Sequence, residues 1–274
     1  MRGAIWGLVM ALAGAGGATA QDSALRSFRT GDDSRGWEAV GRLDIAGTAF
    51  CTATLIAPDE VLTAAHCLFD RITGKPVDPT SIVFRAGLRD GRALAERMVR
   101  QAVPDPSYRQ AARVTAENAR HDLAILKLEH PIRLPSLLPF PVGSTETSGP
   151  SVGVVSYALN RAEAPSMQQT CAILGEDHGV LVLSCDVDFG SSGAPIFSME
   201  GGVRQIVSVV SAKAEMDGKP VALGTELDAP MAAIRAQMAA ETTLFGGGAP
   251  PQVRVLAPGQ RGQTGARFVR PDGS

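Results

Sequence analysis

Aromatic residues are scarce in this chain, at 5% of its 274 residues, so a buried core must come mainly from Val, Leu, Ile and Ala. An excess of charge is also missing, since the formal net charge is −2. That balance gives no electrostatic reason to expect nucleic acid or an acidic membrane surface as a partner. With 45% hydrophobic and 20% charged residues, the composition is globular and allows one large domain or two small ones.

No stretch after residue 20 is long and apolar enough to span a bilayer, and no internal repeat is visible. The start of the chain has the pattern of a secretory signal peptide. Arg2 gives the positive charge, residues 5–12 the apolar run, and Ala18-Thr19-Ala20 the cleavage site. The alternative is a membrane anchor, but the segment is rich in glycine and ends without a charged stop. We therefore expect a mature chain from Gln21 that is secreted or periplasmic, with no stable membrane span.

Cysteine is limited to four residues and no Cys-x-x-Cys spacing occurs, which argues against the alternative of a metal site. In an exported chain, four cysteines suggest two disulfides, for which three pairings exist. Cys51 and Cys67 flank one compact strand-turn-strand unit, and Cys171 and Cys185 flank another. We predict a disulfide within each unit, and no metal or other cofactor.

From residue 37 onward, short apolar runs alternate with Gly, Pro and Asp turn signals, a pattern typical of an all-β sandwich or barrel. A helix is expected over Ala229–Ala240, with Met231, Ile234 and Met238 on one face. Strands are expected near Val40–Ile45, Ala49–Ile56, Glu60–Thr63, Ser81–Arg85, Arg97–Val103, Leu123–Leu128, Ser151–Tyr157, Gln169–Leu174, Val180–Ser184, Pro195–Ser198, Val203–Val210 and Val221–Thr225.

The segment 21–36 is polar, and we predict a flexible leader or propeptide there. Residues 37–245 form the expected folded domain. Two barrels would divide in the proline-rich link at 131–150. From Gly246 the chain turns to Gly, Pro, Gln and Arg, so 246–274 is predicted to be a disordered tail with solvated arginines.

The run from Cys185 to Pro195 holds the candidate nucleophile, Ser192. Glycine stands two residues before this serine and one after it, which favours a tight turn with the hydroxyl held outward. Alone the run is weak, because Gly-Ser runs are usually plain turns. Two upstream motifs strengthen it, Thr63-Ala64-Ala65-His66-Cys67 and His121-Asp122-Leu123-Ala124-Ile125-Leu126.

In the order His, Asp, Ser, the three motifs resemble the chymotrypsin-fold serine proteases. An α/β-hydrolase has the order Ser, Asp, His and needs glycine where Ala194 stands. The resemblance covers 39–229 and includes Phe50–Ile56, Asp122–Leu128 and Ile206–Ser208. Within the family it is nearest to bacterial secreted members akin to the glutamyl endopeptidases. It implies two six-stranded antiparallel Greek-key β-barrels with a C-terminal helix.

The resemblance also implies a role for each site residue. Ser192 would be the nucleophile, His66 its base, and Asp122 the carboxylate that orients the imidazole. The amide N–H groups of Gly190 and Ser192 would form the oxyanion hole. His121 is interpreted as a neighbour of the triad. Ser208 either helps to hold Asp122, as the matching serine does in the family, or is an ordinary strand serine.

Two departures concern activation and specificity. Trypsin-like zymogens pair a freed amino group with an aspartate just before the nucleophile, but that position is Ser191 here and no Ile-Val-Gly-Gly start is visible. Asp186, six residues before the nucleophile, stands where trypsin-like members have the acid at the base of the primary pocket. Val209-Val210 replaces the family's Trp-Gly wall and would narrow the mouth of that pocket.

We therefore list Asp186, Ser208 and Val210 as candidate pocket residues. We expect a basic residue, or failing that a small one, before the cleaved bond. Asp188-Phe189-Gly190 spells a kinase tripeptide, but the other kinase motifs are absent. The function predicted is a secreted, monomeric serine endopeptidase that cuts polypeptides through an acyl-enzyme. The alternative is a non-enzymatic binding protein on the same fold.

Overall fold

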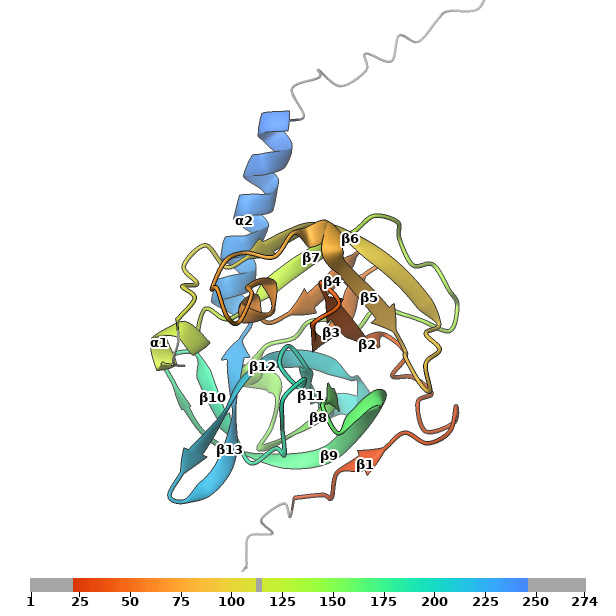
Figure 1. Cartoon of the computed structure of the whole chain (residues 1–274). Helices are drawn as coiled ribbons and strands as arrows, with labels where there is room; N and C mark the ends of the chain where they lie inside the picture. The colour runs from red at the N-terminus through yellow and green to blue at the C-terminus, as the bar shows by residue number, and fades with distance from the viewer. Residues whose placement is uncertain (1–21, 112–114, 246–274) are drawn as a thin grey trace, which may run out of the picture. The chain divides into compact units, whose positions relative to one another are not determined.

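The computed structural model describes residues 22–111 and 115–245, and it contains two closed, six-stranded antiparallel β-barrels (Figure 1). The predicted all-β fold with two barrels and a C-terminal helix is confirmed. The first barrel runs in the order β2-β3-β4-β7-β6-β5. Its strands are β2 (Val40–Ile45), β3 (Ala49–Ala57), β4 (Glu60–Thr63), β5 (Ile82–Ala86), β6 (Ala95–Pro104) and β7 (Ala124–Leu128).

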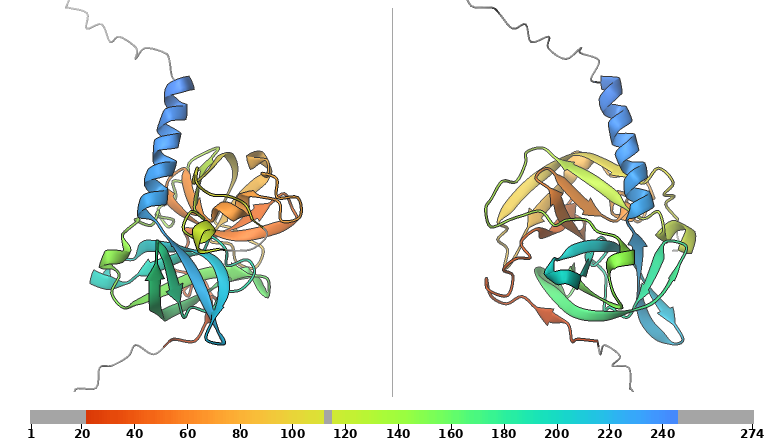
Figure 2. Two further views of the ribbon diagram at one scale, coloured as in Figure 1. Left: turned by 90° about the vertical axis from the view of Figure 1, so that its left-hand side faces the viewer. Right: turned by 180° about the vertical axis from the view of Figure 1, so that it is seen from behind.

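The second barrel uses residues further along the chain, and Figure 2 shows its green and blue strands grouped apart from the orange and yellow ones. Its strands follow the order β9-β10-β13-β12-β11-β8, and β8 pairs back onto β9 to close it. They are β8 (Ser151–Ala158), β9 (Arg161–Asp177), β10 (Val180–Leu183), β11 (Pro195–Ser198), β12 (Gln205–Met216) and β13 (Lys219–Glu226).

Alternation of buried and outward residues explains why these segments form barrel strands. In β5, Ile82, Phe84 and Ala86 are buried, whereas Val83 and Arg85 point outward. Because side chains alternate with period two, this spacing gives the strand one face for the core and one for solvent. Each expected strand is present, but β9 and β12 extend beyond the predicted ends. The added residues include polar ones, and their polar composition gave no sign that they pair as strands.

Aromatic and polar contacts fix one barrel against the other. The rings of Trp37, Phe140 and Phe197 lie 4.7 to 5.8 Å apart between centroids, and all three are buried. Thr52 of β3 donates from Oγ1 to the carbonyl of Gly190 at 2.9 Å and accepts from the amide of Tyr157 at 3.0 Å. These contacts hold a face of the first barrel against the serine-bearing turn of the second.

The chain after β13 forms α2 (Asp228–Phe245), where a helix was expected. Ile234 is fully buried on its inner face. Glu60, a buried acid of the first barrel, accepts from Arg235 at 2.6 Å and pairs with Lys127 at 2.6 Å. A separate compact unit starts at Ala239 and is described only as far as Phe245.

The segment 21–36, for which a flexible leader or propeptide is predicted, contacts the second barrel through its described residues. Strand β1 (Arg26–Ser27) pairs antiparallel with Met167 and Ser166 of β9. Phe28, next along the chain, is fully buried. The polar composition of the segment concealed this single apolar anchor and the open edge of β9 that receives it.

The predicted signal peptide (1–20) and tail (246–274) lie outside the described residues. Across the ranges that are described, no helix is both long and apolar enough to cross a bilayer.

Candidate active site

His66 lies where the first barrel turns toward the second. The strand β4 ends at Thr63, and a short 3₁₀ helix (Ala65–Leu68) carries the histidine. Ala65 and Leu68 are buried in the core, and Cys67 forms the predicted disulfide with Cys51 of β3. The imidazole is therefore anchored on both sides while 28% of its side chain stays exposed.

Asp122 is held by the turn that precedes β7. Thr115 caps the short helix α1 (Ala116–Ala119), and the amide of Asp122 bonds back to the carbonyl of Ala119 at 3.2 Å. The hydroxyl of Thr225 in β13 donates to that same carbonyl at 2.6 Å. The Asp122 carboxylate is buried, and these contacts fix the backbone that carries it.

The His66 ring and the Asp122 carboxylate meet at 2.7 Å, Nδ1 to Oδ2, and the amide of His66 donates to Oδ1 at 2.8 Å. Burial lowers the pKa of His66, but the charge of Asp122 and its hydrogen bond outweigh burial, so that pKa lies above its usual value. The arrangement fixes the tautomer and leaves Nε2 as the proton acceptor when the ring is neutral.

Ser211, and not Ser208, supports this carboxylate. The Ser211 hydroxyl donates to Asp122 Oδ2 at 2.5 Å, whereas Ser208 donates to the carbonyl of Thr225 at 2.8 Å. Both serines are buried on β12, three residues apart. Of the two interpretations of Ser208, these hydrogen bonds fit an ordinary strand serine, and it is the second Val-Ser pair of the strand that meets Asp122.

The candidate nucleophile sits in a turn pressed against the histidine segment. Thr52 donates its amide to the carbonyl of Ser192 at 2.8 Å. Gly193 has φ of +78°, and a side chain there would collide with Thr63 and the carbonyl oxygen of Thr52. Only glycine allows this approach. Ser192 is half-buried, and no hydrogen bond joins its hydroxyl to His66 within the described ranges.

The amide groups next to Ser192 are free to bind an anion. Gly190 has φ of +96°, and a side chain there would strike the ring of Phe50. Among the residues that the structure describes, the amides of Gly190 and Ser192 donate to no partner. Two unsatisfied donors flanking one hydroxyl are what an oxyanion hole requires.

Behind the turn, Ser191 is fully buried and belongs to a network with Arg161. The Ser191 hydroxyl lies 3.2 Å from both Ser156 Oγ and the carbonyl of Tyr157. Arg161 approaches it at 3.5 Å and donates to the carbonyl of Ser156 at 2.7 Å. Burial lowers the pKa of Arg161, and the negative charges of nearby Asp186 and Asp188 oppose that shift. The guanidinium of Arg161 therefore lies beside Ser191, the position at which trypsin-like zymogens have an aspartate.

Asp186 and Lys213 line a cavity of about 90 Å³ together with Cys185, Val187 and neighbouring residues of β13. Asp186 is exposed, and its amide donates to the side-chain oxygen of Gln168 at 2.7 Å. Ser208 and Val210 do not line this cavity, and both are buried. The part of β12 that lines the cavity is Lys213, two residues after Ser211, and not Val209-Val210.

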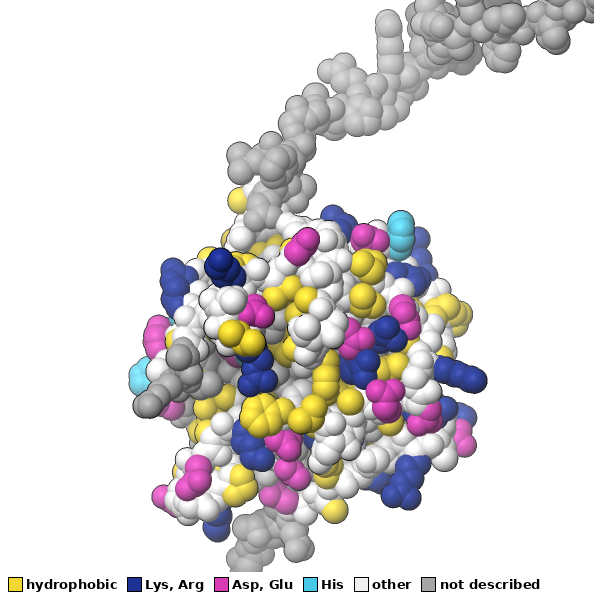
Figure 3. Space-filling model, in the orientation of Figure 1, with side chains coloured by type: hydrophobic (Ala, Val, Ile, Leu, Met, Phe, Trp, Pro, Cys, Tyr) yellow, Lys and Arg dark blue, Asp and Glu magenta, His cyan; other side chains and the backbone are white. Residues whose placement is uncertain are grey.

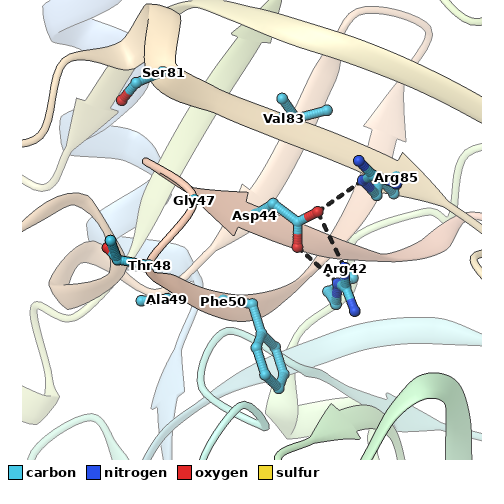
Figure 4. A pocket seen from close by; sticks show the side chains of 9 residues that line it. All are labelled: Arg42, Asp44, Gly47, Thr48, Ala49, Phe50, Ser81, Val83 and Arg85. Atoms are coloured by element: carbon cyan, nitrogen blue, oxygen red, sulfur yellow. Dashed lines mark hydrogen bonds and ion pairs between the residues drawn. The ribbon is translucent and has the colours of Figure 1, made fainter. Parts of the chain in front are cut away.

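A larger cavity of about 410 Å³ lies on the first barrel, and Phe50 is one of its lining residues (Figure 4). Asp44 lies between Arg42 and Arg85, 2.7 Å from the nearest nitrogen of each. Arg42 also donates to the carbonyl of Ala162 on the second barrel at 3.0 Å. The charges in this cavity are thus paired with one another.

Two other candidate clusters do different work. Cys51, His66 and Cys67 bring their ligand atoms within 4.8 Å of one another, but the two sulfurs are bonded to each other and are not thiolates. The His121 ring contacts a different acid, Asp105, at 3.0 Å. The second predicted disulfide, Cys171–Cys185, is also formed.

Two antiparallel barrels with a His–Asp pair and a glycine-braced serine turn define the class of chymotrypsin-like folds. A family model described as a trypsin-like peptidase domain matches residues 48–204, which include His66, Asp122 and Ser192. The chain therefore belongs to the family of trypsin-like peptidase domains. A solved structure of a Glu endopeptidase in complex with MPD is similar at a TM-score of 0.64 and 17% identity, over 78% of this chain and 96% of that one. At that identity the likeness shows the fold alone.

Sequence reasoning missed Ser211, Arg161 and Lys213. Ser211 carried a usable signal, because a second serine three residues after Ser208 has the same strand context. Arg161 and Lys213 carried no such signal. An arginine after a turn and a lysine late in a strand look like ordinary surface residues in the sequence, and only the folded barrels bring them to the site.

Proposed function

We propose that this protein is a serine endopeptidase that hydrolyses polypeptides through an acyl-enzyme. The observation that carries the proposal is the continuous chain of contacts from Ser211 through Asp122 to His66, beside a turn that presents Ser192. A hydrogen-bonded acid, an oriented imidazole and a serine hydroxyl are the parts that nucleophilic acyl transfer needs.

In this mechanism Ser192 Oγ attacks the carbonyl carbon while His66 Nε2 takes the hydroxyl proton. Asp122 stabilises the imidazolium that forms. The amides of Gly190 and Ser192 donate to the oxyanion, and each such donor typically contributes about 2.7–4 kcal/mol. His66 then gives its proton to the leaving amine, and water hydrolyses the acyl-enzyme with the same histidine as base. Catalytic hydrogen bonds to the nucleophile often tighten only when substrate binds.

The primary pocket favours a small residue before the cleaved bond. We expected a basic residue first and a small one second. Lys213 shares the cavity with Asp186 and weakens its attraction for a substrate cation. The cavity of about 90 Å³ also leaves little room for an extended arginine. A peptide library varied at that residue distinguishes the two preferences.

Export belongs to the same proposal. The signal-peptide pattern at 1–20 and two disulfides with no free cysteine in the described residues support a chain that folds in an oxidising compartment.

The test is labelling with a fluorophosphonate, followed by peptide mapping of the modified residue. The expected result is one adduct, on Ser192, and none in Ser192→Ala. Absence of labelling in a folded wild-type protein supports the alternative of a non-enzymatic binding protein. An adduct on another serine overturns the assigned nucleophile.

A further inference from the structure

Arg71 and Phe189 lie on opposite barrels beside the catalytic residues. Arg71 follows His66 by five residues, and Phe189 immediately precedes Gly190. The guanidinium carbon of Arg71 lies 5.3 Å from the centre of the Phe189 ring. Both side chains are exposed, the phenylalanine by 63%. We propose that this pair binds a substrate carboxylate on the leaving-group side of the cleaved bond, a specificity that rests on the proposed endopeptidase function.

Both loops are held in place without substrate. The Asp70 carboxylate accepts from the amides of Ile72 at 3.1 Å and Thr73 at 2.7 Å, which fixes the turn around Arg71. The amide of Phe189 donates to Asp188 at 2.9 Å, and its carbonyl accepts from Leu159 at 2.7 Å. A preorganised contact of this kind binds with less loss of conformational entropy.

The charge of Arg71 has no carboxylate partner among the described residues, unlike Arg42 and Arg85, which share Asp44 (Figure 4). A guanidinium that contacts a ring keeps N–H donors that can bind a carboxylate in two-point geometry. Basic and acidic side chains are mixed on the face drawn in Figure 3. Recognition therefore depends on this local cation and not on a broad charged surface.

The position of Arg71 relative to His66 indicates that Arg71 faces the leaving-group side of the cleaved bond. The acyl-side cavity is lined only by residues of the second barrel, at 184–187, 213 and 220–221. Arg71 belongs to the first barrel, close enough to His66 for its charge to oppose the rise in that histidine's pKa. Because His66 protonates the leaving amine, the residue after the cleaved bond passes this edge of the site.

The proposal is tested with peptides identical to the best library substrate except for Glu, Gln or Lys directly after the cleaved bond. Wild type is expected to show kcat/KM on the order of tenfold higher for Glu than for Gln. Arg71→Gln should abolish that preference, and Arg71→Glu should favour Lys. Arg133→Gln, at an exposed arginine outside the site, is the matched control and should keep the wild-type ratio. Equal ratios in wild type and Arg71→Gln overturn the proposal.

A second measurement distinguishes the carboxylate sources and does not need turnover. Peptides with one residue after the bond, as free acid or as amide, report on a C-terminal carboxylate, and internal Glu reports on a side chain. Fluorescence anisotropy of labelled peptides on Ser192→Ala should show tighter binding with a carboxylate, lost when Arg71→Gln is added. If wild type neither hydrolyses peptides nor takes the fluorophosphonate, the endopeptidase proposal fails, and this binding comparison still decides the role of Arg71.

Discussion

At the scale of single residues, the Asp122 carboxylate is the most constrained group of the site. It accepts from the His66 amide, the His66 ring and the Ser211 hydroxyl, all within 2.8 Å. Each donor removes one way for the acid to turn, so the imidazole that faces it has one tautomer and one orientation. Ser211→Ala should therefore weaken catalysis without removing it, since the other two contacts remain.

The nucleophile has the most direct prediction. Ser192→Ala should abolish peptide hydrolysis, because the neighbouring hydroxyl of the turn, that of Ser191, is buried and bonded to Ser156 and Tyr157. The thermal melting temperature should stay near that of wild type, since Ser192 is only half-buried and its side chain makes no hydrogen bond to His66 in the described chain. If the purified Ser192→Ala variant still cleaves peptides at the wild-type rate, another residue is the nucleophile.

The raised pKa of His66 sets the acid limb of activity. Only the neutral imidazole acts as the base, so kcat/KM should fall as pH falls through a pKa above the usual value near 6.5. Asp122→Asn removes the charge that raises this pKa, so the limb should move to lower pH. The same variant should lose about four orders of magnitude in kcat, as expected for a triad histidine held in the wrong tautomer.

The pH profile also separates Arg71 from its neighbours. Groups whose charge acts on the His66 ring are Asp122, which raises its pKa, and Arg71, which lowers it. Arg71→Gln should therefore shift the acid limb upward, opposite to Asp122→Asn. The measurement is kcat/KM as a function of pH for wild type and for Arg71→Gln. If the acid limb lies at the same pH in both, solvent screens the charge of Arg71 from His66.

At the scale of elements, the turn 188–192 depends on what lies beneath it. Arg161 reaches Ser191 and Ser156 from the start of β9. Arg161→Met should lower kcat by about ten- to hundredfold, because small displacements of catalytic groups have effects of that size. Arg161→Lys should recover part of the rate, since it keeps the charge but not the fork of donors. If Arg161→Met lowers the melting temperature but leaves kcat unchanged, Arg161 contributes to packing and does not position the turn.

Particular elements show how far the sequence could predict the fold and the site. The strands β2, β4 and β11 have the expected bounds, because each is a short run with apolar residues that turn signals bound. The disulfides followed from local spacing. Ser211 was missed because the strand register decides which serine reaches Asp122, and register depends on pairing with β13. Lys213 and Arg161 depend on barrel closure, which no local pattern encodes.

At the scale of the whole molecule, activation should not require a freed amino group. The position beside the nucleophile is Ser191, a neutral residue already bonded within the chain. Proteins that start at several positions between Asp22 and Trp37, each with a free or acetylated amine, should have similar kcat. Activity confined to one start, and lost on its acetylation, would contradict this prediction.

The same series should separate stability from activity. A chain starting at Trp37 lacks β1 and the buried ring of Phe28. Burial of such a ring typically stabilises by about 1.5–3 kcal/mol, so this variant should melt earlier while keeping its kcat.

The docked leader also changes what a processing cut would produce. If a protease cleaves after Arg35, the segment from Asp22 stays paired with β9 and keeps Phe28 in the core. The product is then a nicked two-chain protein, with an unchanged native mass and an additional short peptide under denaturing conditions. Maturation of this chain is therefore to be followed by denaturing mass spectrometry, since size-exclusion chromatography would see no difference.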